Sequence, residues 1–169
     1  ASHGDYIGGY NTEVAGWVQY SSVYYPAMAC NNFSVFNGPQ TEVYIEVRLF
    51  AGNWWVGFNH HWVGYYPASL FDTTGLRIYA SKVYWYGESI DEGDGDNTYT
   101  DIGSGHFSHQ GFTKAAFMRL LRYRTMNDTF AHYINPIIIY DTPGQYTVDP
   151  YFESTGSWGS HMYFGGPGA

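Results

Sequence analysis

Residues 41–50 carry the clearest pattern in the chain, a strict alternation of apolar and polar side chains. The apolar positions are Val43, Ile45, Val47 and Leu49, and the positions between them are Glu42, Tyr44, Glu46 and Arg48. Because successive side chains on a strand point to opposite faces, we expect a strand with a buried apolar face and a solvated polar face. Ala51-Gly52-Asn53 is typical of a turn and leads into a second, aromatic strand at residues 54–58.

The composition extends this β pattern to the whole chain. Aromatic residues make up 21% of the 169 residues, and 21 glycines are spread among them. Aromatic side chains favour pleated sheets and glycine supplies turns, so we expect an all-β fold. Short strands separated by turn signals favour an antiparallel sandwich or barrel over a parallel sheet. The length and the lack of internal repeats predict a single domain over residues 1–169.

Further strands are expected where aromatic and β-branched residues cluster, at residues 15–20, 27–36, 83–86, 130–140, 145–152 and 161–164. Pro67 is expected to begin a single helical turn over residues 67–71. Residues 113–124 fit both a helix and a strand, and propensity alone favours the helix.

Charge and cysteine content restrict the partners. The formal net charge is −8 with only seven lysines and arginines, so binding to nucleic acid is not expected. No apolar run has the length of a membrane span. The lone Cys30 cannot form a disulfide within the chain, and it does not fix the compartment. Few lysines and many tyrosines favour an extracellular location.

Glu88 is the first candidate site residue. It follows the expected aromatic strand at residues 83–86 and precedes a glycine-bracketed segment that contains Ser104 and His106. A carboxylate at the end of an aromatic strand is partly desolvated, which suits acid–base chemistry. Glycines nearby let the backbone approach a ligand closely. The alternative interpretation is a surface glutamate on a hairpin.

The candidate metal ligands are weaker. Adjacent strand residues point to opposite faces, so His60 and His61 do not chelate one metal together. His106 and His109 lack a third ligand, and we expect neither a metal nor a cofactor. The acidic run at residues 91–96 resembles a calcium loop in composition but lacks the EF-hand order, and we interpret it as a solvated loop.

Two other short motifs decide little. Ser104 lies between glycines without the motif of a nucleophile elbow, so a serine hydrolase is not expected. Asn32 and Asn127 begin glycosylation sequons, which are meaningful only for a secreted protein from a host that uses them.

Several motifs, taken in order, resemble the neprosin family, whose founding members are secreted plant prolyl endopeptidases of the glutamic type. The matching segments are residues 52–55 with Phe58, 63–71, 85–88, 103–107, 111–115, 158–159 and 163–168. The resemblance implies an antiparallel, jelly-roll-like β-sandwich. It also implies that residues 113–124 form a strand, against the helical propensity.

The family's mechanism implies a pair of glutamates, one activating a water and the other protonating the leaving amine. Glu88 matches the second glutamate. Glu13 superficially echoes the first but is displaced by one residue, which on a strand would turn its side chain to the wrong face. The better alignment places residues 10–19 on a later family strand. By this alignment the chain corresponds to the C-terminal two-thirds of the family domain, without its first strand or its cysteines.

We therefore expect a catalytically incomplete, extracellular module that self-associates through exposed sheet edges. The alternative is an active glutamic endopeptidase that cleaves after proline, using Glu88 with Glu13, Glu46 or a glutamate of another chain. A third possibility is carbohydrate binding through Trp54, Trp55, Trp62 and Tyr65. The candidate binding residues near these motifs are Trp54, Trp55, Trp85, Ser104 and His106.

Overall fold

The computed structural model describes residue 12 and residues 14–89, 99–134, 137–139, 142–153 and 155–168. These residues form short strands with three single 3-10 turns, and every pair of named strands runs antiparallel. The predicted all-β class is confirmed. The described part of the chain contains no helix with the length and apolar character to span a membrane.

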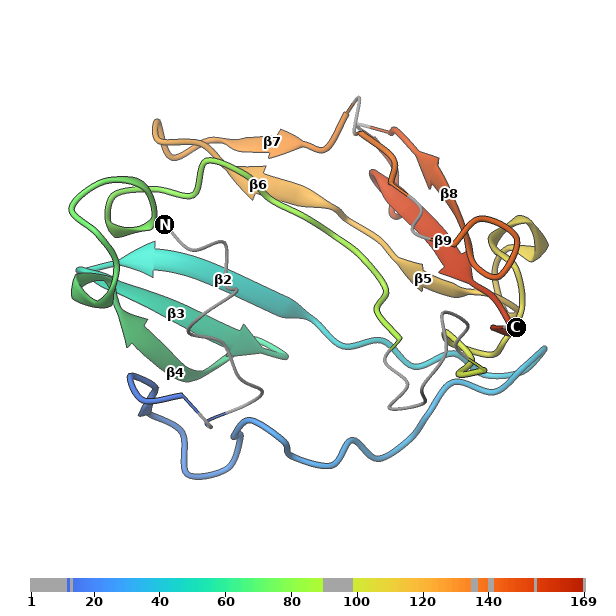
Figure 1. Ribbon diagram of the computed structural model, residues 1–169, viewed down its shortest axis with the longest axis horizontal. Coiled ribbons are helices and arrows are strands. Elements are labelled where there is room, and N and C mark those ends of the chain that lie inside the picture. Colours follow the sequence, from blue (N-terminus) through green and yellow to red (C-terminus); the bar gives the residue numbers. More distant parts are fainter. Residues whose placement is uncertain are drawn as a thin grey trace. The chain divides into compact units, whose positions relative to one another are not determined.

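The described residues group into two compact units (Figure 1). The first unit comprises Ala1–Phe33 and Thr41–Val83, and the second comprises Ser34–Gln40 and Tyr84–Ala169. A single domain over residues 1–169 stays a prediction.

The first unit contains one four-stranded sheet in the order β1-β4-β3-β2. Its strands are β1 (Val18–Gln19), β2 (Ile45–Phe50), β3 (Asn53–Phe58) and β4 (His61–Pro67). Ala51 and Gly52 join β2 to β3 with φ angles of 48° and 73°, the left-handed conformation that a tight hairpin turn needs. The predicted turn is confirmed, as is the helical turn after Pro67, which forms η1 (Ala68–Leu70).

The prediction of which face of β2 is buried was wrong. Ile45 and Val47 are 65% and 61% exposed, whereas Glu46 and Arg48 are half-buried. Glu46 lies opposite Gly57, over which the Trp62 ring lies, and Arg48 lies opposite Trp55. Long charged side chains can cover apolar surface with their stems. Glu46 and Arg48 therefore share the face of the sheet that carries Trp55.

The second unit contains a three-stranded sheet, in the order β5-β9-β8, and a two-stranded sheet of β6 and β7. The strands are β5 (Ala116–Met118), β6 (Arg122–Arg124), β7 (Phe130–His132), β8 (Thr147–Tyr151) and β9 (His161–Gly165). The expected strands at residues 145–152 and 161–164 are thus confirmed. The expected strand at residues 27–36 is wrong, because no ladder forms there.

Residues 113–124 form strands, as the family resemblance implied, and the helical propensity is wrong. Leu120 interrupts the segment with a φ angle of 56°, and its N–H donates to the carbonyl of Trp158 at 2.8 Å. β5 before this break pairs with β9, and β6 after it pairs with β7. Tertiary pairing has therefore overridden local propensity.

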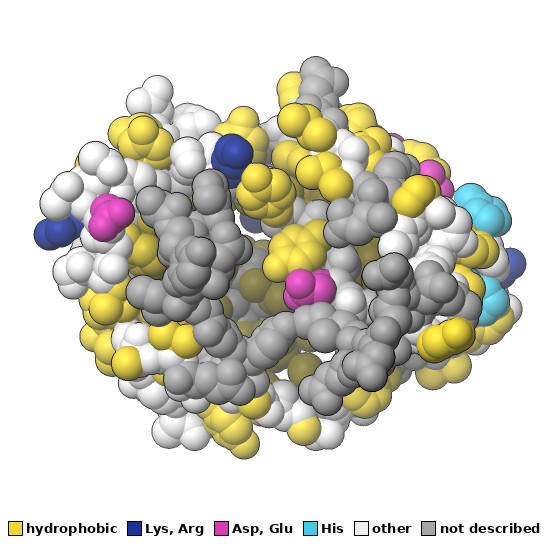
Figure 2. Space-filling model, in the orientation of Figure 1, with side chains coloured by type: hydrophobic (Ala, Val, Ile, Leu, Met, Phe, Trp, Pro, Cys, Tyr) yellow, Lys and Arg dark blue, Asp and Glu magenta, His cyan; other side chains and the backbone are white. Residues whose placement is uncertain are grey.

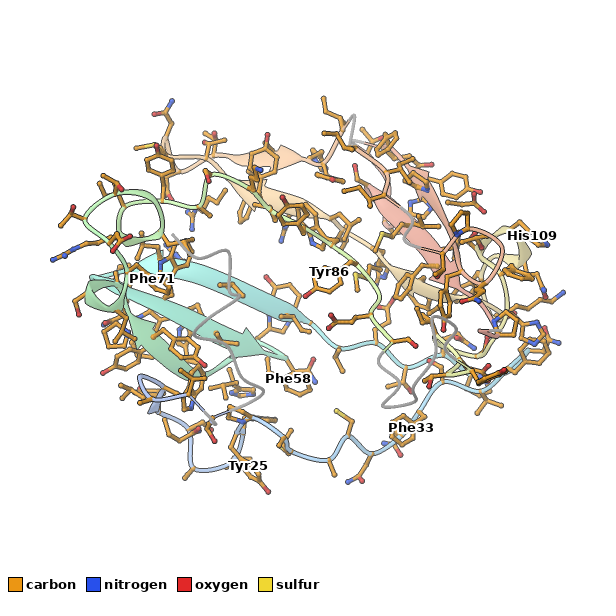
Figure 3. The ribbon with its side chains drawn as sticks, in the orientation of Figure 1. Tyr25, Phe33, Phe58, Phe71, Tyr86 and His109 are labelled. Atoms are coloured by element: carbon orange, nitrogen blue, oxygen red, sulfur yellow. The ribbon has the colours of Figure 1, made fainter. Side chains whose placement is uncertain are left out.

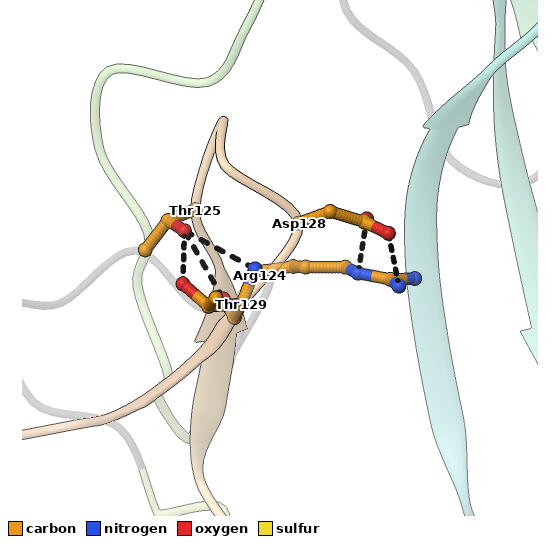
Figure 4. A network of polar contacts seen from close by, with 4 residues as sticks. All are labelled: Arg124, Thr125, Asp128 and Thr129. Carbon is orange, nitrogen blue, oxygen red and sulfur yellow. Dashed lines mark hydrogen bonds and ion pairs between the residues drawn. The ribbon is translucent and has the colours of Figure 1, made fainter.

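The β6–β7 hairpin is closed by polar contacts at its tip (Figure 4). Arg124 Nε lies 2.6 Å from Asp128 Oδ1, and the hydroxyls of Thr125 and Thr129 are 2.7 Å apart. The Asp128 side chain is 71% exposed, so this ion pair contributes little to stability.

An aromatic cluster covers one face of β9. Tyr163 contacts Phe117, Tyr151, Trp158 and His161, with ring centroids 5.7 to 6.5 Å apart. Burial raises the pKa of the Tyr163 phenol, and the neighbouring Tyr151 raises it further.

This shift predicts a loss of stability at alkaline pH. An unfolded tyrosine ionises near pH 10, while folded Tyr163 still holds its proton. The stabilisation is therefore complete below pH 10 and is lost as the pH rises toward the folded pKa. We expect Tyr163→Phe to show a shallower alkaline decline in the free energy of unfolding than the wild type, in urea titrations above pH 9.5. Identical slopes would contradict this assignment.

Candidate functional site

Glu88 lies in an extended segment of the second unit that pairs with no strand. The aromatic strand predicted at residues 83–86 is therefore wrong. Trp85 is half-buried against Tyr133, with ring centroids 4.5 Å apart. The Tyr86 side chain is 63% exposed (Figure 3). The segment is held by side-chain contacts in place of a backbone ladder.

Gly87 fixes the backbone directly before Glu88. A Cβ at this position would lie 2.6 Å from two ring carbons of Phe164 and 3.3 Å from Ile102 Cγ2. The bare backbone therefore lies against the Phe164 ring, on strand β9. Only glycine allows so close an approach.

Ser89 fixes the backbone directly after Glu88. Its hydroxyl lies 3.2 Å from the hydroxyl of Tyr146, which in turn donates to the carbonyl of Thr100 at 2.7 Å. Glu88 thus stands between two anchored neighbours. Its own side chain is exposed, so the expectation that it is partly desolvated is wrong.

The glycine-bracketed segment after Glu88 is packed into the second unit. The Ser104 hydroxyl donates to the carbonyl of Lys114, and the Ile102 N–H donates to the carbonyl of Gly166 at 3.0 Å. The His106 ring stacks on Phe36 with centroids 4.4 Å apart. These contacts give Ser104 and His106 structural roles, and whether either binds a ligand stays a prediction.

The partner of Glu88 stays a prediction too. Glu46 is half-buried on β2, in the first unit, while Glu88 belongs to the second. Glu13 lies outside the described residues.

Three of the described histidines that were considered as metal ligands contact aromatic rings. His60 stacks on Tyr44, His61 on Tyr24 and His109 on Phe107, with centroids 4.3, 5.1 and 6.0 Å apart. His109 is labelled in Figure 3. Within the described residues, no group of three or more histidine, cysteine or acidic side chains could hold a metal ion. The acidic run at residues 91–96 lies outside the described residues.

Trp54 and Trp55 lie on opposite faces of the first unit's sheet. Trp54 is anchored by its indole N–H, which donates to the carbonyl of Leu76 at 2.6 Å. Trp55 contacts Tyr20, Trp62 and Tyr65, with centroids 5.4, 5.8 and 4.5 Å apart. Sequence reasoning did not identify Tyr20 as a site residue, because its contact with Trp55 depends on a loop conformation.

Figure 3 labels Tyr25 and Phe58, which line an apolar cavity of about 260 Å³ in the first unit. Its walls also include Trp17, Val56 and Tyr66. No charged side chain is among the described residues that line it.

The family model described as Neprosin matches residues 2–167, essentially the whole chain. The chain therefore belongs to the neprosin family.

Proposed function

We propose that this neprosin-family chain is an extracellular β-sheet protein that self-associates through strand β2 at the edge of the first unit's sheet. This proposal rests on the exposure of apolar side chains of β2. Ile45, Val47 and Phe50 are 65%, 61% and 59% exposed. On the face drawn in Figure 2, hydrophobic side chains are more widespread than charged ones.

The exposure of these side chains matters because β2 is an edge strand of the sheet. β2 pairs with β3 on one side only, within the described sheet, so its other side offers backbone N–H and C=O groups. An exposed apolar edge strand is a template for pairing with another chain. The partner we propose is a second copy of this chain, whose own β2 presents the same groups.

The test is the size of the purified protein at neutral pH, by light scattering and electron microscopy. We expect the wild type to be a dimer, because two copies that pair through β2 use up both exposed edges. The double variant Ile45→Lys/Val47→Lys should be monomeric, because charges on an edge strand oppose pairing. Ile78→Lys, at a 54% exposed side chain outside the strands, is the matched control and should assemble like the wild type. A monomeric wild type would contradict self-association.

A second candidate function is glutamic endopeptidase activity on proline-containing peptides. It is favoured by the anchoring of Gly87 and Ser89, which holds an exposed carboxylate between two fixed points. Hydrolysis needs one group to activate water and another to protonate the leaving amine. Glu88 would be one of these groups, with Glu13, Glu46 or a glutamate of a second chain as the other.

A further inference from the structure

A β-bulge in β4 gathers aromatic rings on one face of the first unit's sheet. Val56 pairs with Gly64 but Gly57 pairs with Trp62, which leaves Val63 as an extra residue. Strict alternation would place Trp62 and Tyr65 on opposite faces, and the bulge brings them to the same one. The Trp62 ring lies over Gly57, where a Cβ would be 3.3 Å from its nearest ring carbon.

The same bulge anchors a loop beside these rings. The Val63 carbonyl accepts the backbone N–H groups of Tyr20 and Ser21, at 3.0 and 2.9 Å, and the side-chain amide of Gln19 at 3.0 Å. The Tyr20 ring meets Trp55 edge-on, at an interplanar angle of 83°. Tyr20 is nevertheless 67% exposed, so its ring is available to a ligand.

Between the loop and β4 lies a groove of about 560 Å³. Its described lining consists of Tyr20, Ser21, Ser22, Val23, Tyr24, His61 and Trp62, with no lysine, arginine, aspartate or glutamate. The Ser21 hydroxyl oxygen accepts the N–H groups of Val23 and Tyr24, at 3.1 and 2.9 Å, which leaves its own O–H to donate.

We propose that this groove binds a neutral oligosaccharide. Aromatic faces carry partial negative charge and attract the weakly positive C–H groups of a sugar ring. Hydroxyl side chains both donate and accept hydrogen bonds, as sugar hydroxyls do. The uncharged lining offers no counter-ion to an anionic or cationic ligand, and the chain's net charge of −8 disfavours anions further. No described groove residue belongs to β2 or to the Glu88 segment, so this proposal stands apart from both proposed functions.

The test is titration of the full chain with soluble hexasaccharides of glucose and of mannose. Binding is monitored by tryptophan fluorescence. We expect saturable quenching with at least one of them. Tyr20→Ala should weaken binding at least fivefold, because it removes an exposed aromatic face on which a sugar ring can stack. The exposure of Tyr20 and its backbone bond to Val63 leave this variant folded. Trp62→Phe, which keeps a ring, should bind between the wild type and Tyr20→Ala.

The control is Tyr79→Ala, at a 45% exposed tyrosine of the same unit outside the groove, which should bind like the wild type. Hexaproline and choline are titrated in parallel, because aromatic grooves also bind proline-rich segments and quaternary ammonium groups. Binding of either one without saccharide binding would overturn the proposal. Saccharide binding that is unchanged in Tyr20→Ala, or no saccharide binding, would do the same.

Discussion

Alanine at position 166 is expected to lower the free energy of unfolding by about 3 kcal/mol or more, within the range of severe overpacking. Gly166 is buried, and a Cβ there would lie 1.9 Å from the Gln145 carbonyl oxygen and 2.9 Å from the Tyr146 Cα. Both neighbours are backbone atoms, so no side-chain rotation relieves the clash. Moving Gly166 would also break its hydrogen bond from Ile102.

Urea denaturation followed by circular dichroism measures this loss. Gly52→Ala is the matched control, because no atom lies within 4 Å of its Cβ position and only its φ angle of 73° opposes a side chain. That strain costs about 1–2 kcal/mol. Equal losses in the two variants would show that the Gly166 contact is not the cause.

Local patterns located the strands better than they oriented them. The alternation of residues 41–50 and the Ala51-Gly52 turn correctly placed the β2–β3 hairpin. The same alternation predicted the wrong face, because it treats Glu46 and Arg48 as solvated regardless of what lies opposite. Gly57 and Trp55 lie opposite them, and a pairing partner cannot be read from one strand alone.

The sites depend even more on contacts that are distant in sequence. Glu88 was singled out by its place after an aromatic segment and by a family resemblance, while its anchors Phe164 and Tyr146 are distant in sequence and carry no local signal. The expected aromatic strand at residues 83–86 failed because propensity does not supply a pairing partner. The β-bulge at Val63 could not be predicted either, because one extra residue in a strand leaves no recognisable sequence pattern.

The second large effect is expected from Gly87→Ala. The new methyl group meets the Phe164 ring, so either the ring or the Glu88 segment must move, at about 1–3 kcal/mol of stability. A misplacement of about 1 Å reduces catalysis by about 10²-fold. For the endopeptidase activity proposed as the second candidate function, Gly87→Ala should therefore lose about 10²-fold in kcat in a cleavage assay on a proline-containing peptide at acid pH, and Glu88→Gln should lose all cleavage. Self-association should be unchanged in both, because neither change touches β2.

Two further variants separate positioning from general destabilisation. Gly159→Ala, in the same unit, meets Leu120 at 3.2 Å and should lose stability while keeping its cleavage rate. The double variant Gly87→Ala/Phe164→Leu removes the ring that the methyl group meets and should recover part of the lost rate. Full activity in Gly87→Ala would contradict the positioning of Glu88. A wild type that assembles without cleaving any proline-containing peptide would contradict the peptidase candidate, because the anchored Glu88 would then lack the second group that hydrolysis needs.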